Sequence, residues 1–290
     1  MSALFTPFNL KDVSLRNRIA IPPMCQYNAV DGLINDWHRV HLAGLARGGA
    51  DLVIVEATAV SPEGRITPGC TGLWSDQQAQ AFAPIVASIR AAGAVPGIQL
   101  AHAGRKASAN RPWEGGNHIA ADDPRGWQTI APSAIAFGDH LPRVPKAMTL
   151  QDIARVRKDF VVAAKRARDA GFEWLELHFA HGYLGQSFFS MHSNQRNDVY
   201  GGSLDNRSRF LLETLAAVRD VWPEHLPLTA RFGVIEYDGR DEETLAESIE
   251  LARNFKRAGL DMLSVSVGFS TPTAQIPWAP AFLVLMQIFA

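Results

Sequence analysis

The chain alternates regularly between short apolar runs and longer segments with helical periodicity, and this alternation limits the folds open to it. Six apolar runs have the length of buried strands, at residues 19–21, 52–56, 95–100, 172–178, 228–232 and 262–267. Amphipathic helices are predicted between them, at residues 36–47, 76–92, 150–170, 207–222 and 242–258. A hairpin is predicted within residues 4–16. Repeated β-α alternation predicts a parallel sheet covered by helices.

Polar side chains interrupt the apolar runs close to their carboxyl ends. Gln99, Glu176, His178 and Arg231 alternate there with apolar residues, which places the polar residues on the face turned away from the helices. An open doubly wound sheet would bury apolar residues on both faces, and no Gly-x-Gly-x-x-Gly follows an early strand. Polar residues that converge at one end favour a TIM (β/α)8-type barrel, of which about six βα units are present in this chain.

Length and composition fit a single barrel domain over residues 1–290, because the chain is 47% hydrophobic and no low-complexity linker divides it.

A net charge of −1 gives no reason to expect nucleic acid or an anionic membrane as a partner. No signal peptide or membrane-spanning stretch is found, so a soluble, cytoplasmic protein is expected. Cys25 and Cys70 have neither a disulfide framework nor a zinc spacing. The oligomeric state stays open, with a homo-oligomer considered.

His178, His181 and Tyr183 lie where the fourth predicted strand gives way to a loop. If the strand stops near His178, the following turn can bring His181 back beside it. The pair would then grip a carbonyl compound, and Tyr183 would supply a weak acid. Two other interpretations are buried core histidines and a metal pair. A metal pair needs further ligands, and residues 22–27 after the first strand contain no His-x-His. No metal is therefore expected.

Other polar residues near the strand ends have two interpretations each. Cys25 is either a small buried hydrophobe or a cofactor contact, and no partner motif supports it as a nucleophile. Tyr27 is either a packing residue or a residue that reaches over a ligand. Arg231 needs an anionic partner, which is either Glu176 or a bound anion. Gln99 carries a buried amide that needs partners of its own.

Together, four segments resemble the Old Yellow Enzyme family of FMN-dependent NADH:flavin oxidoreductases. They are Asn17-Arg18-Ile-Ala-Ile-Pro-Pro-Met24, Gln99-Leu-Ala-His102-Ala-Gly-Arg105, His178-Phe-Ala-His181-Gly-Tyr183 and Tyr200-Gly-Gly-Ser203. Cys25 with Tyr27 resembles a bacterial xenobiotic reductase subgroup of this family, and the likeness runs from Met1 to about Phe282. The order and number of the segments make the combined signal specific.

The resemblance implies a role for each site residue. Residues that would contact the flavin are Pro23, Met24, Cys25, Ala57, Gln99 and Arg231, with Arg231 at the N1/O2 edge. His178 and His181 would donate to a substrate carbonyl or nitro oxygen, and Tyr27 would help to close the pocket. NADPH or NADH would reduce FMN, flavin N5 would pass hydride to the β-carbon of an activated alkene, and Tyr183 would protonate the α-carbon.

The predicted strands stop at the sixth, whereas a complete barrel has eight. The chain ends in an uncharged segment, of which about residues 283–290 diverge from the family. This end is expected to be either a truncated or frame-shifted reading frame or a genuinely divergent helix. In barrels the loops after strands seven and eight commonly hold a cofactor's phosphate. The alternative function is therefore an inactive or regulatory barrel fragment that binds FMN poorly.

Overall fold

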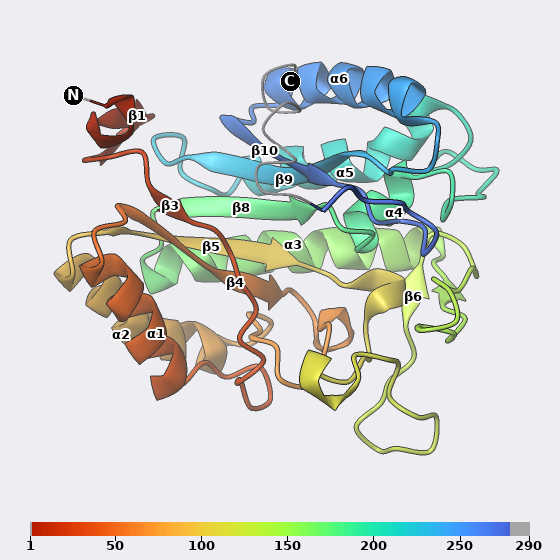
Figure 1. Cartoon of the computed structure of the whole chain (residues 1–290), viewed down its shortest axis with the longest axis horizontal. Helices are drawn as coiled ribbons and strands as arrows, with labels where there is room; N and C mark the ends of the chain where they lie inside the picture. Colours follow the sequence, from red (N-terminus) through yellow and green to blue (C-terminus); the bar gives the residue numbers. More distant parts are fainter. Residues whose placement is uncertain (1, 279–290) are drawn as a thin grey trace.

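The structure, a computed structural model, describes residues 2–278. Its centre is a six-stranded parallel sheet of β3 (Ala20–Ile21), β4 (Leu52–Ala59), β5 (Val95–Ala101), β8 (Trp174–Phe179), β9 (Leu228–Ile235) and β10 (Met262–Val267). The strands follow one another in the sheet in the same order as in the chain (Figure 1). Because a doubly wound sheet would reverse its strand order at a switch point, the winding is that of the predicted (β/α) barrel.

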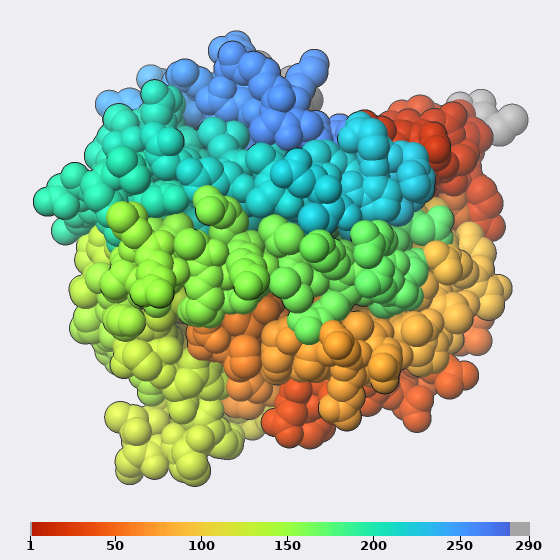
Figure 2. Space-filling model, turned by 180° about the vertical axis from the view of Figure 1, so that it is seen from behind, coloured from red at the N-terminus to blue at the C-terminus, as the bar shows by residue number. Residues whose placement is uncertain are grey.

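Helices cover the outer face of this sheet. They are α1 (Asp36–Arg47), α2 (Asp76–Ala91), α3 (Leu150–Ala170), α5 (Leu204–Arg219) and α6 (Asp241–Arg257). Neighbouring helices pack together in chain order, and Figure 2 shows them from behind as successive bands of colour. Thr149 caps the start of α3, and Gly171 ends it with a φ of 94°, as predicted. The side chain of Ser203 caps α5, which therefore begins at Leu204 rather than at the predicted residue 207.

The two faces of the sheet carry different side chains. Ile98, Leu175 and Leu177 have no exposed surface and belong to the core that the helices cover. Burial of such a side chain contributes about 1.5–3 kcal/mol. Gln99 and Glu176 lie in register on β5 and β8 and project from the other face. The apolar outer layer thus stabilises the sheet, and the inner face carries the polar groups, as the alternation predicted.

The N-terminal hairpin covers the amino ends of the strands. It consists of β1 (Phe8–Leu10) and β2 (Val13–Leu15), which pair antiparallel as predicted. Val13 and Leu15 form a small core with Leu52 and Trp174, the first residues of β4 and β8. The hairpin therefore closes the bottom of the barrel and leaves the carboxyl ends for other segments.

The long segment of residues 103–148 lies at the carboxyl ends of the strands and contains only short elements (Figure 1). The short elements of the chain are η1 (Ala3–Phe5), η2 (Pro62–Gly64), η3 (Gly104–Lys106), η4 (Pro112–Glu114), β6 (Ile130–Ala131) and β7 (Lys146–Ala147). One further helix, α4 (Leu184–Phe189), was not predicted. It follows Tyr183 directly and is fully buried.

Within residues 2–278 the sheet has two open edges, β3 and β10. Each of these strands pairs with one other strand of the sheet, β4 and β9 respectively. The prediction of six βα-type strands is confirmed. The divergent segment predicted at residues 283–290 lies outside the described residues.

Candidate active site

A tight turn at the end of β8 separates the members of the predicted donor cluster. The amide of Tyr183 donates to the carbonyl of Ala180 over 3.2 Å, and the two residues between them have positive φ, 61° at His181 and 66° at Gly182. Two consecutive positive φ values are typical of a type I′ turn, which glycine adopts without strain. The turn brings His181 and Tyr183 back beside His178.

The three rings of this cluster pack edge to face. The ring centroids of His178 and His181 are 4.9 Å apart, and those of His178 and Tyr183 are 5.0 Å apart. His178 is buried at 4% exposure. Nε2 of His181 lies 2.7 Å from the hydroxyl of Ser266 on β10. The structure therefore brings together the three residues that the sequence analysis assigned to the catalytic step.

Hydrogen bonds and burial keep both imidazoles neutral. Nδ1 of His178 accepts the amide N–H of Ala180 over 3.2 Å, so the neutral ring carries its proton on Nε2. Burial, and then the charges of His181, Arg231 and Lys106, hold the pKa of His178 well below its ordinary value. Burial, followed by Arg231 and Lys106, lowers the pKa of His181 to about 3. Each ring therefore has one N–H to donate at neutral pH.

These shifts make the free energy of unfolding sensitive to acid. Between the ordinary histidine pKa of about 6.5 and the pKa of about 3 in the folded protein, the unfolded chain binds a proton at His181 that the folded chain does not. The free energy of unfolding should fall with falling pH in this range, by up to about 1.4 kcal/mol per pH unit for this group. We expect the free energy of unfolding, measured with urea, to change less with pH in His181→Asn than in the wild type between about pH 6 and pH 4. Equal slopes in both proteins would show that folded His181 is protonated.

Tyr183 has the protonation state that a general acid requires. Burial, followed by Cys25 and Cys70, raises its pKa above the ordinary value for a phenol. The hydroxyl therefore stays protonated at neutral pH, and it can still donate to a strongly basic carbanion. The amine of Lys106 lies 6.0 Å from the centre of the Tyr183 ring.

Arg231, Gln99 and Glu176 lie on the inner face, next to the histidine pair. Gln99 Nε2 donates to Glu176 Oε1 over 2.7 Å, and Arg231 lies in register with His178. Burial raises the pKa of Glu176 to about 7, against the opposing effects of Arg231 and Gln99. Among residues 2–278 nothing hydrogen-bonds to the buried Nε of Arg231. Two partners were considered for Arg231, Glu176 and a bound anion. Glu176 interacts with Arg231 through charge and without a hydrogen bond, so the guanidinium can donate to a bound ligand.

The loop after β3 carries the next group of predicted site residues, Pro23, Met24, Cys25 and Tyr27. Burial, followed by Cys70 and the Glu56 carboxylate, raises the pKa of the Cys25 thiol. A protonated thiol is a poor nucleophile, which leaves packing or cofactor contact for Cys25.

Two anchors hold this loop at the carboxyl end of the barrel. The amide of Gln26 donates to the Glu56 carboxylate on β4 over 3.1 Å. The carbonyl of Tyr27 accepts a hydrogen bond of 3.0 Å from Arg111 in the long segment. Ala57, also on β4, lies in register with Gln99. The predicted site residues therefore lie at carboxyl ends or in the loops that follow them, except Arg231, which lies in the middle of β9 because that strand continues to Ile235 and not only to the predicted residue 232.

Lys106 is a residue of this region that the sequence analysis did not identify. Its amine donates to the carbonyls of His181 (2.8 Å) and Phe269 (2.6 Å). Burial, followed by Arg105, lowers the pKa of Lys106 to about 7. The signal in the sequence was the adjacent pair Arg105 and Lys106, a few residues after the buried strand β5, since buried cations need specific partners.

Gly182 is in a position where no side chain fits. A Cβ atom there would lie 2.2 Å from the carbonyl oxygen of Phe269 and 2.8 Å from Nζ of Lys106, at a φ of +66°. We expect Gly182→Ala to lower the free energy of unfolding by about 2–5 kcal/mol, from backbone strain and overpacking together. Gly202→Ala is the matched control, because Gly202 has a φ of +80° and a Cβ atom there would meet nothing within 4 Å among the described residues. It should cost only the strain, about 1–2 kcal/mol. Equal losses in chemical denaturation would contradict the close contact.

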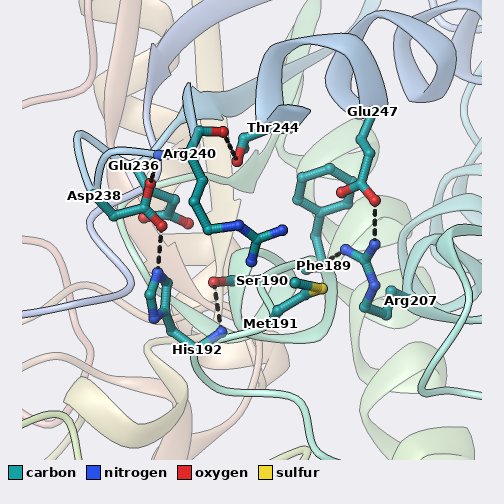
Figure 3. A pocket seen from close by; sticks show the side chains of 10 residues that line it. All are labelled: Phe189, Ser190, Met191, His192, Arg207, Glu236, Asp238, Arg240, Thr244 and Glu247. Atoms are coloured by element: carbon teal, nitrogen blue, oxygen red, sulfur yellow. Dashed lines mark hydrogen bonds and ion pairs between the residues drawn. The ribbon is translucent and has the colours of Figure 1, made fainter. Parts of the chain in front are cut away.

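A separate small pocket lies beyond α4, at the start of α6 (Figure 3). Two ion pairs join side chains that line it: His192 lies 2.6 Å from Asp238, and Arg207 lies 2.6 Å from Glu247. Within residues 2–278 no three His, Cys, Asp or Glu side chains form a group that could hold a metal ion.

The comparisons with known proteins agree with this geometry. The sequence model of the NADH:flavin oxidoreductase / NADH oxidase family matches residues 3–274. The chain is 42% identical to an NADH:flavin oxidoreductase of Gibberella zeae, over 94% of this chain and 69% of the relative. It is also 42% identical to an NADPH dehydrogenase of Bacillus velezensis, over 91% of this chain and 73% of the relative.

Solved structures of proteins with the same fold indicate the same family. The structure of morphinone reductase in complex with tetrahydroNAD superposes with a TM-score of 0.79 at 31% identity, over 91% of this chain and 74% of that one. The Old Yellow Enzyme from Pichia sp. AKU4542 superposes with a TM-score of 0.78 at 29% identity, over 91% and 70% of the two chains. The chain therefore belongs to the NADH:flavin oxidoreductase / NADH oxidase family, whose enzymes are TIM barrels of the Old Yellow Enzyme type that use FMN with NAD(P)H as the reductant.

Proposed function

We propose that this chain is an ene-reductase that uses FMN and NAD(P)H to reduce activated C=C bonds, with enones as the main substrate class and nitro compounds as a second. The observation that carries the proposal is the His178–His181–Tyr183 cluster, in which two neutral donors pack against a protonated phenol. Two N–H donors can both hydrogen-bond to one polarised substrate oxygen, and a nearby phenol can protonate a substrate carbon.

The residues present fit FMN. The guanidinium of Arg231 lacks a hydrogen-bond partner at its buried Nε within residues 2–278, which suits the electron-rich N1/O2 edge of the flavin. Gln99 and Ala57, in register on neighbouring strands, would contact the ring from the barrel interior. Pro23, Met24 and Cys25 would line its side from the loop after β3. When bound, FMN supplies the hydride that the β-carbon of the substrate accepts.

The side chains of this chain would then bind and protonate the substrate. Nε2–H of His178 would donate to the carbonyl oxygen. His181 would donate through Nδ1–H when the Ser266 hydroxyl donates to its Nε2. Both donors strengthen as negative charge develops on the oxygen, and each is worth on the order of 100-fold in rate. Tyr183 would protonate the α-carbon, and Tyr27 would close the pocket above it.

We also propose that the described residues form one domain. The larger of the two hydrophobic cores runs from Ile34 near α1 to Val265 on β10, which supports this proposal. Within residues 2–278 no helix combines the length and the apolar character needed to cross a bilayer. Small-molecule partners, NAD(P)H and the enone, would enter at the carboxyl end of the strands.

The proposal is tested on the purified chain by two measurements. Flavin absorbance gives the amount of FMN retained, and NADPH oxidation with and without 2-cyclohexenone gives turnover. We expect yellow protein and oxidation of NADPH that the enone accelerates. Colourless protein that neither retains added FMN nor oxidises NADPH would contradict the proposal. That result would favour the alternative, an inactive or regulatory barrel fragment. This alternative is considered because β3 and β10 are open edges within residues 2–278.

A further inference from the structure

The amine of Lys106 joins two loops of the site through their backbones. It lies on η3 after β5 and donates to the carbonyl of His181, after β8, over 2.8 Å. It also donates to the carbonyl of Phe269, after β10, over 2.6 Å. Three loops that are far apart in the sequence thus meet at one amine.

The loops that Lys106 joins have unfavourable backbone conformations. His181 has a φ of 61° and Phe269 has a φ of 53°, and both lie in the left-handed region that non-glycine residues avoid. Such conformations persist where surrounding contacts over-determine them. The carbonyl that Lys106 binds belongs to the His181–Gly182 peptide, which is the central peptide of the turn.

The surroundings of Lys106 indicate that its amine mainly binds backbone carbonyls. Its amine lies 4.0 Å from the centre of the Phe137 ring, and the acidic group that acts on it, Glu236, does so through charge alone. No salt bridge to Lys106 is found within residues 2–278, and a buried amine in that position depends on its hydrogen-bond acceptors. Here both acceptors are main-chain oxygens of the loops that carry His181 and Phe269.

We infer that Lys106 is a positioning residue: it fixes the His181–Gly182 peptide, so that His181 and Tyr183 face the same substrate. This inference rests on the proposed function, because the turn matters for catalysis only if those two residues act on one substrate. Lys106 would act through the turn and not on the reacting atoms. Small displacements of catalytic groups, of about 1 Å, can lower a rate by about 100-fold.

The test compares Lys106→Met, which keeps a similar stem and removes the donors, with Lys106→Arg, which keeps a charged donor. Lys146→Met is the matched control, since Lys146 is exposed and its amine pairs with Asp152 over 3.4 Å. Hydrogen–deuterium exchange reports the Tyr183 amide that closes the turn, and kcat is measured with 2-cyclohexenone. We expect Lys106→Met to raise exchange in residues 180–184 and to lower kcat by about 10- to 100-fold. Lys106→Arg should restore both to within about 3-fold, and Lys146→Met should change neither.

Three results would overturn the inference: wild-type kcat in a folded Lys106→Met protein, lowered kcat with unchanged exchange in residues 180–184, or failure of Lys106→Arg to restore either quantity. If Lys106→Met does not fold, Lys106→Gln, which keeps one donor group, replaces it with the same expected direction. Failure of the proposed function is a different result, namely a wild-type chain that does not reduce the enone. In that case exchange decides alone: a faster exchange in the turn supports the role of Lys106, and an unchanged one overturns it.

Discussion

Tyr183→Phe is expected to slow reduction of 2-cyclohexenone by about 100- to 10,000-fold, the usual contribution of a general acid. Reduction of the bound flavin by NADPH should remain within about 3-fold of the wild-type rate, because that half-reaction needs no proton from Tyr183. The ring of the variant still packs against His178, where the centroids are 5.0 Å apart in the wild type. The substitution therefore removes only the hydroxyl.

The two half-reactions are measured separately by stopped-flow absorbance of the flavin. Tyr200→Phe is the matched control, because its hydroxyl donates to Glu213, outside the cluster, over 2.8 Å. That variant should lose about 1 kcal/mol of stability from one hydrogen bond and keep its enone rate. If Tyr183→Phe slowed both half-reactions equally, Tyr183 would be a binding residue and not the proton donor.

His178→Ala is expected to have a different kinetic pattern. Loss of one donor to a developing oxyanion should lower kcat/KM for the enone by about 100- to 1,000-fold. Reduction of the flavin by NADPH should also slow, because we propose that the nicotinamide and the enone bind in turn at the same place beside His178. The neutral Nε2–H tautomer that Ala180 stabilises is the donor that this variant lacks.

The control for His178→Ala is His192→Ala, since His192 is paired with Asp238 in the separate pocket of Figure 3. It should leave both half-reactions unchanged. We expect His178→Ala to slow both flavin reduction and enone reduction, and Tyr183→Phe to slow enone reduction alone. This difference would assign ligand binding to His178 and protonation to Tyr183. If folded His178→Ala had the wild-type kcat/KM for the enone, His178 would not be a donor to the substrate oxygen.

Local patterns were enough to predict the strands and helices of the barrel. Bounds such as those of α1 and α3 depend on apolar periodicity and on nearby caps, so neighbouring residues decide them. Helix α4 was missed because its six residues, Leu184–Phe189, are too few to show a periodicity. Its burial depends on contacts with distant elements, such as the stacking of Phe188 on Phe210 of α5.

The sequence by itself determined the barrel winding, the polar inner face and the membership of His178, His181 and Tyr183 in one cluster, because strand alternation and a short turn are local properties. Only the tertiary structure decided how that cluster is held and charged. The neutral state of His181 follows from burial beside Arg231 and Lys106, which lie on other strands or loops. Likewise, Lys106 reaches carbonyls 75 and 163 residues away along the chain. Contacts over such separations depend on how the strands curl around a common axis, and no pattern within one segment reports them.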